Sequence, residues 1–97
     1  MPIGVLFEFR GVTQAQYDKV IDRLTKGKGL KRLADWPVPG ILFHVAGPTD
    51  NGWRVVDVWE SEKAFADFGK TLMPILQEAK FPETPPQFFP VHNLVRS

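Results

Sequence analysis

GWRVVDVWES, residues 52–61, is the stretch that decides the fold predicted for this chain. Its valines and tryptophans favour an extended strand. Strand alternation then places Trp53, Val55, Asp57 and Trp59 on one face. Asp57 is the unusual member, because an acid stands there between two tryptophans and among valines. It either belongs to a functional site or is a structural carboxylate that another polar side chain pairs.

A second strand is predicted just before this stretch. GILFHVAG, residues 40–47, has strand composition, with Ile41, Phe43 and Val45 alternating onto one side. The cluster PTDNG, residues 48–52, contains the Asn-Gly signal of a tight reversal, although we expect a loop longer than two residues. The two strands therefore form a hairpin.

A helix is predicted directly after the stretch. Ser61 is placed to cap its N-terminus, with Glu62 in the first turn. Pro74 lacks a backbone donor, so we expect a bend or break there, to which Gly69 would contribute. Residues 81–87 are predicted as a loop and FFPVHNLV, residues 88–95, as the last strand. The apolar side of the helix consists of Phe65, Phe68, Leu72, Ile75, Leu76 and Ala79.

The chain opens with another strand and helix. IGVLFEF, residues 3–9, is predicted as a strand, and Thr13 with Gln16 has the spacing of a capping box. Gly27 and Gly29 are expected to end the helix. A further short turn is predicted before the prolines at 37 and 39, around Leu30, Leu33 and Trp36. The apolar stripe of the helix is Tyr17, Val20, Ile21 and Leu24.

The resulting order is strand, helix, strand, strand, helix, strand. This is the α+β, ferredoxin-like βαββαβ plan, with a four-stranded antiparallel sheet in a single domain, residues 1–97. Its usual sheet places strand one beside strand three, with strands four and two at the edges. Pro90 agrees with this order, because a proline within a strand belongs on an edge.

Composition excludes several classes of protein. Apolar residues make up 43% of the 97 residues and charged residues 24%, which is ordinary for a globular domain. The net charge of +1 indicates no general affinity for nucleic acid or anionic membranes. No cysteine is present, which excludes disulfides and thiolate metal sites. With no signal peptide or membrane span recognisable, we expect a cytoplasmic protein.

The apolar residues on both faces of the predicted sheet indicate a homodimer. Two helices cover only one face of a four-stranded sheet, and the other face would then be polar. Here Leu6 lies opposite the phenylalanine face of strand one, and strand three carries valines on both faces. A second copy packed sheet to sheet would cover the uncovered face. The alternative is a monomer in which the loop at residues 81–87 covers it.

The segment VDVWES followed by a helix opening EKAF, within this six-element order, resembles the dimeric α/β-barrel superfamily, and in particular its antibiotic biosynthesis monooxygenase-like branch. The plan covers nearly the whole chain, whereas the specific motif covers residues 55–68. The resemblance implies a homodimer with a pocket between sheet and helices. Members include cofactor-free oxygenases of phenolic polyketides, haem-degrading enzymes, cyclases and isomerases, so it informs on shape more than on chemistry.

The chain departs from the haem-degrading members of that branch. Many relatives place a histidine in the helix after the WES segment, roughly where Phe68 stands here. Phenylalanine neither ligates iron nor transfers a proton. Haem-degrading members also use an asparagine in strand one, where this chain has apolar residues and Glu8. We therefore expect no haem.

Asp57, His44 and His92 are the candidate catalytic residues. A carboxylate among aromatic rings can have a raised pKa and act as a base. Histidines predicted mid-strand can transfer protons. In the more ordinary alternative, Asp57 is paired by a histidine or arginine, and each histidine is buried and hydrogen-bonded. The spacing of these residues matches no metal motif, so no metal site is predicted.

Several aromatic residues are candidates for binding a flat ligand, although for most of them a place in the core is the more ordinary explanation. Tyr17 could orient a ligand oxygen or pack with its hydroxyl at the rim. A basic cluster, Lys26, Lys28, Lys31 and Arg32, could hold an acidic partner or be a solvated loop. The aromatic candidates are Trp53, Trp59, Phe65, Phe68 and Tyr17.

The leading interpretation is a small homodimer that binds or transforms a small aromatic or polyketide-like molecule without a cofactor. If it is an oxygenase, the protein deprotonates the substrate and excludes water. The rival interpretation is a non-catalytic ligand-binding or structural dimer. Neither nucleic acid nor a membrane is an expected partner. The two interpretations differ in whether Asp57, His44 and His92 face one cavity.

Overall fold

The computed structural model describes residues 1–96 and confirms the predicted α+β order. Strand β1 and helix α1 come first, and the hairpin strands β2 and β3 lead to α2 and a short final strand. A short 3₁₀ turn, η1, lies where a further turn was predicted. The bounds are β1 Ile3–Arg10, α1 Gln14–Leu24, η1 Leu33–Asp35, β2 Ile41–Thr49, β3 Gly52–Trp59, α2 Glu62–Glu78 and β4 Gln87–Pro90.

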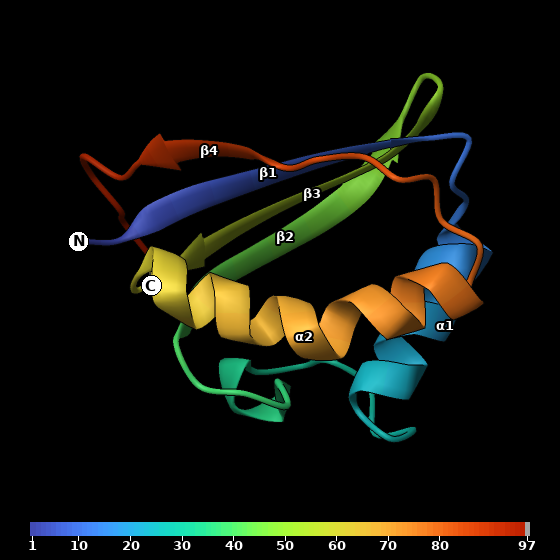
Figure 1. Cartoon of the computed structure of the whole chain (residues 1–97), viewed down its shortest axis with the longest axis horizontal. Helices are drawn as coiled ribbons and strands as arrows, with labels where there is room; N and C mark the ends of the chain where they lie inside the picture. The colour runs from blue at the N-terminus through green and yellow to red at the C-terminus, as the bar shows by residue number, and fades with distance from the viewer. Residues whose placement is uncertain (97) are drawn as a thin grey trace.

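The four strands form one antiparallel sheet in the order β2-β3-β1-β4, as the ferredoxin-like plan predicts. β4, which contains Pro90, is an edge strand and pairs with β1. Figure 1 shows both helices on the same face of this sheet. Within residues 1–96, the opposite face carries no helix. No helix within residues 1–96 is long and apolar enough to cross a membrane.

The hydrophobic core lies between the sheet and the two helices. Alternate residues of β1 point into it, from Ile3 to Phe9, and α2 contributes Phe68 and Leu72. Trp59 and Val5 are fully buried at its centre. Each core aromatic side chain removes a large apolar area from water, which stabilises the helix layer on the sheet.

The helix caps formed as predicted, whereas the expected break in α2 did not occur. Thr13 and Gln16 make a reciprocal capping box, and Ser61 accepts a hydrogen bond from the Ala64 amide. α2 runs without interruption through Pro74, so of the expected bend or break, the break did not occur. Pro74 lies on the exposed side, where water can bond the carbonyl that loses its partner. The buried Leu72 and Leu76 anchor the helix on either side of the proline.

The turn between β2 and β3 is shorter than expected. Thr49 pairs with Gly52, so the turn consists of Asp50 and Asn51 alone. Pro48 was expected in the loop but lies within β2, opposite Trp53. β2 is an edge strand, and a proline can occupy an edge because no neighbour requires its amide.

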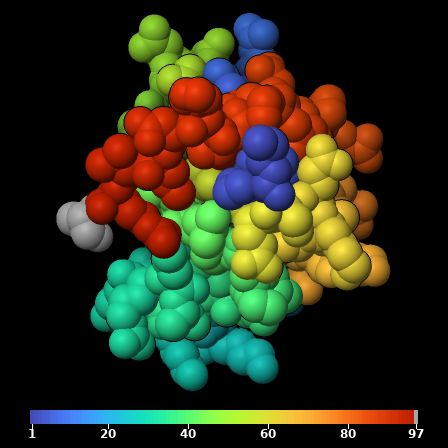
Figure 2. Space-filling model, turned by 90° about the vertical axis from the view of Figure 1, so that its left-hand side faces the viewer, coloured from blue at the N-terminus to red at the C-terminus, as the bar shows by residue number. Residues whose placement is uncertain are grey.

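The last strand is also shorter than predicted. β4 ends at Pro90, and residues 91–95 are not a strand. The amide of Val91 donates to the Pro2 carbonyl at 3.1 Å, and Arg96 then contacts the carbonyl of Leu42 in β2. The chain therefore leaves the edge of the sheet after four paired residues. Figure 2 shows this C-terminal segment beside the N-terminus at one end of the molecule.

The helix-free face of the sheet is apolar in its middle. By register it carries Leu6 and Val56, which are half-buried, and Val45, which is 49% exposed. The ring of Phe89 lies over Gly4, where any side chain would collide with it. We call the apolar set on this face, in which Val58 alone is buried, the open face: Leu6, Phe43, Val45, Val56, Val58 and Phe89.

Candidate functional site

His44, which is partly buried, and the buried Asp57 form a cross-strand pair at the centre of the site. They are direct partners in the β2–β3 register, and His44 Nδ1 lies 2.6 Å from Asp57 Oδ1. Directly opposed residues of antiparallel strands share a face, and this face is the one that the helices cover. Asp57 is 2% exposed. The prediction that a histidine pairs this carboxylate is confirmed for His44.

A β-bulge creates this pairing. Ile41 pairs with Trp59 and Phe43 pairs with Val58, so Leu42 is an extra residue in β2. In a regular register His44 would lie opposite Val56, on the open face. The expectation that Ile41, Phe43 and Val45 share a face was therefore wrong for Ile41, which is buried in the core.

Tyr17 continues the pair from helix α1. Its hydroxyl lies 2.6 Å from His44 Nε2, and its ring packs 5.2 Å from Trp53. A carboxylate oxygen can only accept a hydrogen bond, so Nδ1–H donates to Asp57 and Nε2 accepts from the tyrosine hydroxyl. Burial raises the pKa of Tyr17 to about 12, with the negative charges of Asp57 and Asp18 adding to the effect. The hydroxyl therefore stays protonated at neutral pH and donates the hydrogen bond to His44 Nε2.

Trp59 completes the row of hydrogen bonds. Its Nε1 donates to Asp57 Oδ2 at 3.2 Å, and the indole is wholly buried. Both oxygens of Asp57 are therefore hydrogen-bonded, which offsets the cost of burying a carboxylate. We call the connected set Tyr17, His44, Asp57 and Trp59 the polar chain. It explains the acid between two tryptophans: one tryptophan binds the carboxylate, and Trp53 supports Tyr17.

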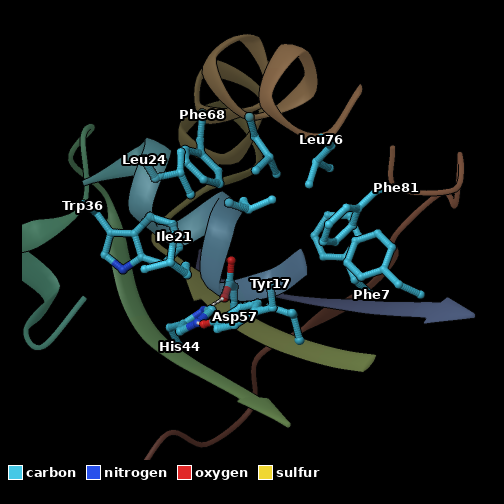
Figure 3. Close-up of a pocket in the computed structure, with 14 residues that line it drawn as sticks. Phe7, Tyr17, Ile21, Leu24, Trp36, His44, Asp57, Phe68, Leu76 and Phe81 are labelled. Atoms are coloured by element: carbon cyan, nitrogen blue, oxygen red, sulfur yellow. Dashed lines mark hydrogen bonds and ion pairs between the residues drawn. The ribbon is translucent and has the colours of Figure 1, made fainter. Parts of the chain in front are cut away.

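The polar chain forms part of the wall of a small cavity between sheet and helices. The cavity volume is about 40 Å³, enough for very few water molecules or one diatomic gas molecule. In Figure 3 Tyr17, His44 and Asp57 lie together on one side, with Leu24, Phe68 and Leu76 opposite. The remaining walls are also apolar: Phe7, Phe9, Val20, Ile21, Trp36, Val55, Leu72 and Phe81.

A larger groove adjoins this cavity between α2 and the loop after it. Its volume is about 610 Å³, which is within the usual range for small-molecule sites. Phe65 and Met73 line the groove from α2, and residues 81–86 form its other side. Five side chains border both spaces and separate them: Phe7, Phe9, Leu72, Leu76 and Phe81.

The predicted site residues do not all lie around the same space in the structure. Tyr17, His44, Asp57 and Phe68 line the cavity, and Phe65 lines the groove. Trp53 and Trp59 are buried core residues: Trp59 belongs to the polar chain, and Trp53 packs against its Tyr17. Within residues 1–96, neither tryptophan borders the cavity or the groove.

His92 is the clear correction among the candidates. It was expected mid-strand among apolar neighbours, but it is exposed and lies beyond the end of β4. Pro90 ends the pairing with β1, so the chain turns away before His92 can face the core. His92 is not joined to the polar chain.

Sequence reasoning missed Trp36 and Phe81 as cavity residues. Trp36 packs edge-on against both His44 and Phe68, at 5.1 Å in each case. The signal was a tryptophan in a loop rich in charges and prolines, where an exposed indole would be unusual. The polar chain contains two residues of a metal-ligating type, His44 and Asp57. Within residues 1–96, no group of three such residues is close enough to hold a metal ion.

No known family model matches the sequence, and no curated protein matches it. A search of solved structures found SnoaB, a cofactor-independent oxygenase from Streptomyces nogalater. The superposition has a TM-score of 0.59 at 15% sequence identity, and covers 99% of this chain and 95% of that chain. Over nearly its whole length, this chain therefore has the fold of that cofactor-independent oxygenase.

Proposed function

We propose that the protein is a cytoplasmic, homodimeric, monooxygenase-like enzyme that transforms a small aromatic molecule without a cofactor. The observation that carries the proposal is the polar chain in the wall of an apolar cavity. A histidine held by a buried carboxylate on one nitrogen and a hydroxyl on the other is suited to proton transfer. The shared fold with a cofactor-independent oxygenase supports the same class of chemistry.

The groove is the proposed binding site for the body of the substrate. Its aromatic lining, with Phe7, Phe65 and Phe81, suits the faces and edges of a flat ring system. The cavity of about 40 Å³ is too small for such a molecule. The reacting end of the substrate would enter it by displacing the shared phenylalanine and leucine side chains.

The proposed first step is removal of an acidic proton from the substrate. Tyr17 donates its hydroxyl proton to His44 Nε2 as its oxygen takes the proton of the substrate. Asp57 stabilises the imidazolium that forms, through the Nδ1–H bond already in place. The products of this step are a substrate carbanion and a protonated His44, and Tyr17 is neutral again.

In the second step the carbanion reduces dioxygen. For a substrate with a reactive CH₂ group, one oxygen atom replaces the two hydrogens as a carbonyl, and the other leaves as water. The substrate supplies all the electrons, so the protein contributes only the base and a water-poor site. The apolar lining around Phe68 suits both an uncharged gas and the exclusion of water.

The open face supports the proposed homodimer. Val45 and Phe89 are about half exposed there, at 49% and 46%. A contiguous apolar patch on a small domain is typical of an interface. Arg54 and Glu8 form an ion pair at 3.2 Å at one end of it, which gives the apolar centre a polar rim. A two-fold axis would pack this face on its copy.

A second candidate function is ligand binding without chemistry. The observation that favours it is the saturation of the polar chain, because His44 and Asp57 each use both polar side-chain atoms within the protein. Such a network can have a purely structural role, in which it fixes the strand register and the position of α1.

Oxygen uptake with anthrone, an acidic aromatic CH₂ compound, tests the proposal. We expect the protein to accelerate uptake above the spontaneous rate of anthrone, and His44→Gln to lower the acceleration by about 100-fold or more. His92→Gln is the matched control, because His92 is exposed and lines neither the cavity nor the groove of the described residues. Equal rates for wild type and His44→Gln would contradict the proposal. A rise in Tm with anthrone but no uptake would favour the non-catalytic candidate.

A further inference from the structure

A surface depression approaches His44 from outside the cavity. Its volume is about 340 Å³, and its lining includes Tyr17, Trp36 and His44, which also line the inner cavity. These three side chains therefore separate the two spaces. The depression is formed by residues 30–36, by the start of β2 and by Arg96. Figure 2 shows the C-terminal segment meeting the segment before β2 at this side of the molecule.

The charged side chains of the depression are positive. Lys31, Arg32 and Arg96 line it. Asp35 is the nearby acid, and its carboxylate accepts the backbone amides of Lys31 and Arg32, both at 2.9 Å. These two amides hold the pKa of Asp35 below its usual value. The Asp35 carboxylate is thus hydrogen-bonded within its own loop, and it lies 3.8 Å from Arg32. A single carboxylate offsets only part of the charge of the three cations.

A buried donor without a partner lies in the same wall. Trp36 is 9% exposed, and its Nε1 has no hydrogen-bond partner within the described chain. In Figure 3 this nitrogen is turned away from the side chains around the inner cavity. An unpaired buried N–H costs free energy that an acceptor would recover. The wall therefore contains both an N–H donor without an acceptor, that of Trp36, and an excess of positive charge.

The rest of the lining is apolar, with Leu30, Leu33, Leu42 and Phe43. We infer that this depression binds an organic anion: a carboxylate on a small ring-bearing body. Lys31 and Arg32 receive the carboxylate, and the leucines contact the ring. The site is separate from the groove beside α2, and it does not depend on the proposed oxygenase chemistry. It also gives a role to part of the basic cluster that the sequence contains.

Binding of 1-naphthoate, measured by calorimetry, tests the inference, with 1-naphthamide as the uncharged analogue and acetate as the anion without a ring. We expect 1-naphthoate to bind at least tenfold more tightly than either. The indole N–H resonance of Trp36, assigned with Trp36→Phe, is expected to shift on binding more than those of Trp53 and Trp59.

The double substitution Lys31→Gln with Arg32→Gln is expected to weaken 1-naphthoate binding by about tenfold, the combined effect of two exposed charges. Lys63→Gln with Lys70→Gln is the matched control, since those cations lie on α2 beside Asp67. Equal binding of the naphthamide, an unchanged affinity in the first double variant, or an unmoved Trp36 resonance would each overturn the inference. Absence of any 1-naphthoate binding would overturn it as well.

Discussion

His44 faces Asp57 across the hairpin only because β2 contains one extra residue, Leu42, between its pairs with Trp59 and Val58. The bulge moves the histidine from the open face to the face that the helices cover. The hydrogen bond of 2.6 Å between Nδ1 and Oδ1 in turn holds the bulged register. One local irregularity therefore brings the candidate base to its carboxylate partner.

Asp57→Asn tests how strongly this pair stabilises the protein. The substitution keeps the volume of the side chain but removes the charge that accepts from His44 and Trp59. We expect the free energy of unfolding to fall by about 2 kcal/mol, because buried donors lose a charged acceptor. Urea denaturation followed by tryptophan fluorescence measures it. Asp50→Asn, in the exposed turn, is the matched control, and equal losses in the two variants would contradict a special role for the pair.

Tyr17 is the only tyrosine in the chain, so its ionisation can be followed directly by absorbance at alkaline pH. We expect a pKa of about 12 in the folded protein, raised from the usual 10.0 by burial and by the charge of Asp57. A raised folded pKa contributes stability that is present below about pH 10 and is lost as the pH rises through 12.

The Asp57→Asn variant separates the two causes of this shift. Removing the carboxylate charge is expected to lower the pKa of Tyr17 only in part, because burial, the larger cause, remains. Circular dichroism at each pH confirms that the chain is still folded. A tyrosine that ionises near pH 10 in the folded wild type would show that the hydroxyl is not held in the polar chain.

Val45→Glu tests the proposed dimer. Wild type is expected to elute with light scattering at twice the 11.0 kDa mass of the chain. A glutamate on the open face, on the edge strand β2 beside Val56, would be buried without a partner in the dimer, which is costly. We therefore expect the variant to be monomeric. Met73→Glu is the control, because Met73 is equally exposed, at 49%, but lies on α2. A monomeric wild type would remove the proposal.

The fold could be predicted from the sequence because its signals are local and repeated. The alternation in residues 3–9 and 52–59 and the caps at Thr13 and Ser61 each specify one element without reference to the rest. Pro90 then agreed with the sheet order. The errors at Pro48 and Pro74 share one cause: whether a proline ends an element depends on its exposure and its neighbours, which tertiary structure sets.

The site could be predicted only in part for a similar reason. Asp57 and His44 were recognisable as unusual polar residues in apolar strands, but their pairing depended on the bulge at Leu42, which no residue type signals. Tyr17 was recognised, whereas its contact with His44 joins residues 27 apart in the sequence and follows from the docking of α1. The prediction for His92 was wrong because the strand that was expected to continue through Pro90 ends at that residue.

Tyr17→Phe distinguishes a hydroxyl that transfers protons from one that only blocks His44 Nε2 by hydrogen bonding to it. The ring can keep its packing on Trp53, so we expect the fold to be retained. If Tyr17 carries the proton from the substrate to His44, kcat for anthrone oxidation falls by about 100-fold, while KM changes little. Oxygen-uptake kinetics with both parameters resolved measure it. A rise in kcat would show instead that the hydroxyl blocks Nε2, and that the substrate meets His44 directly.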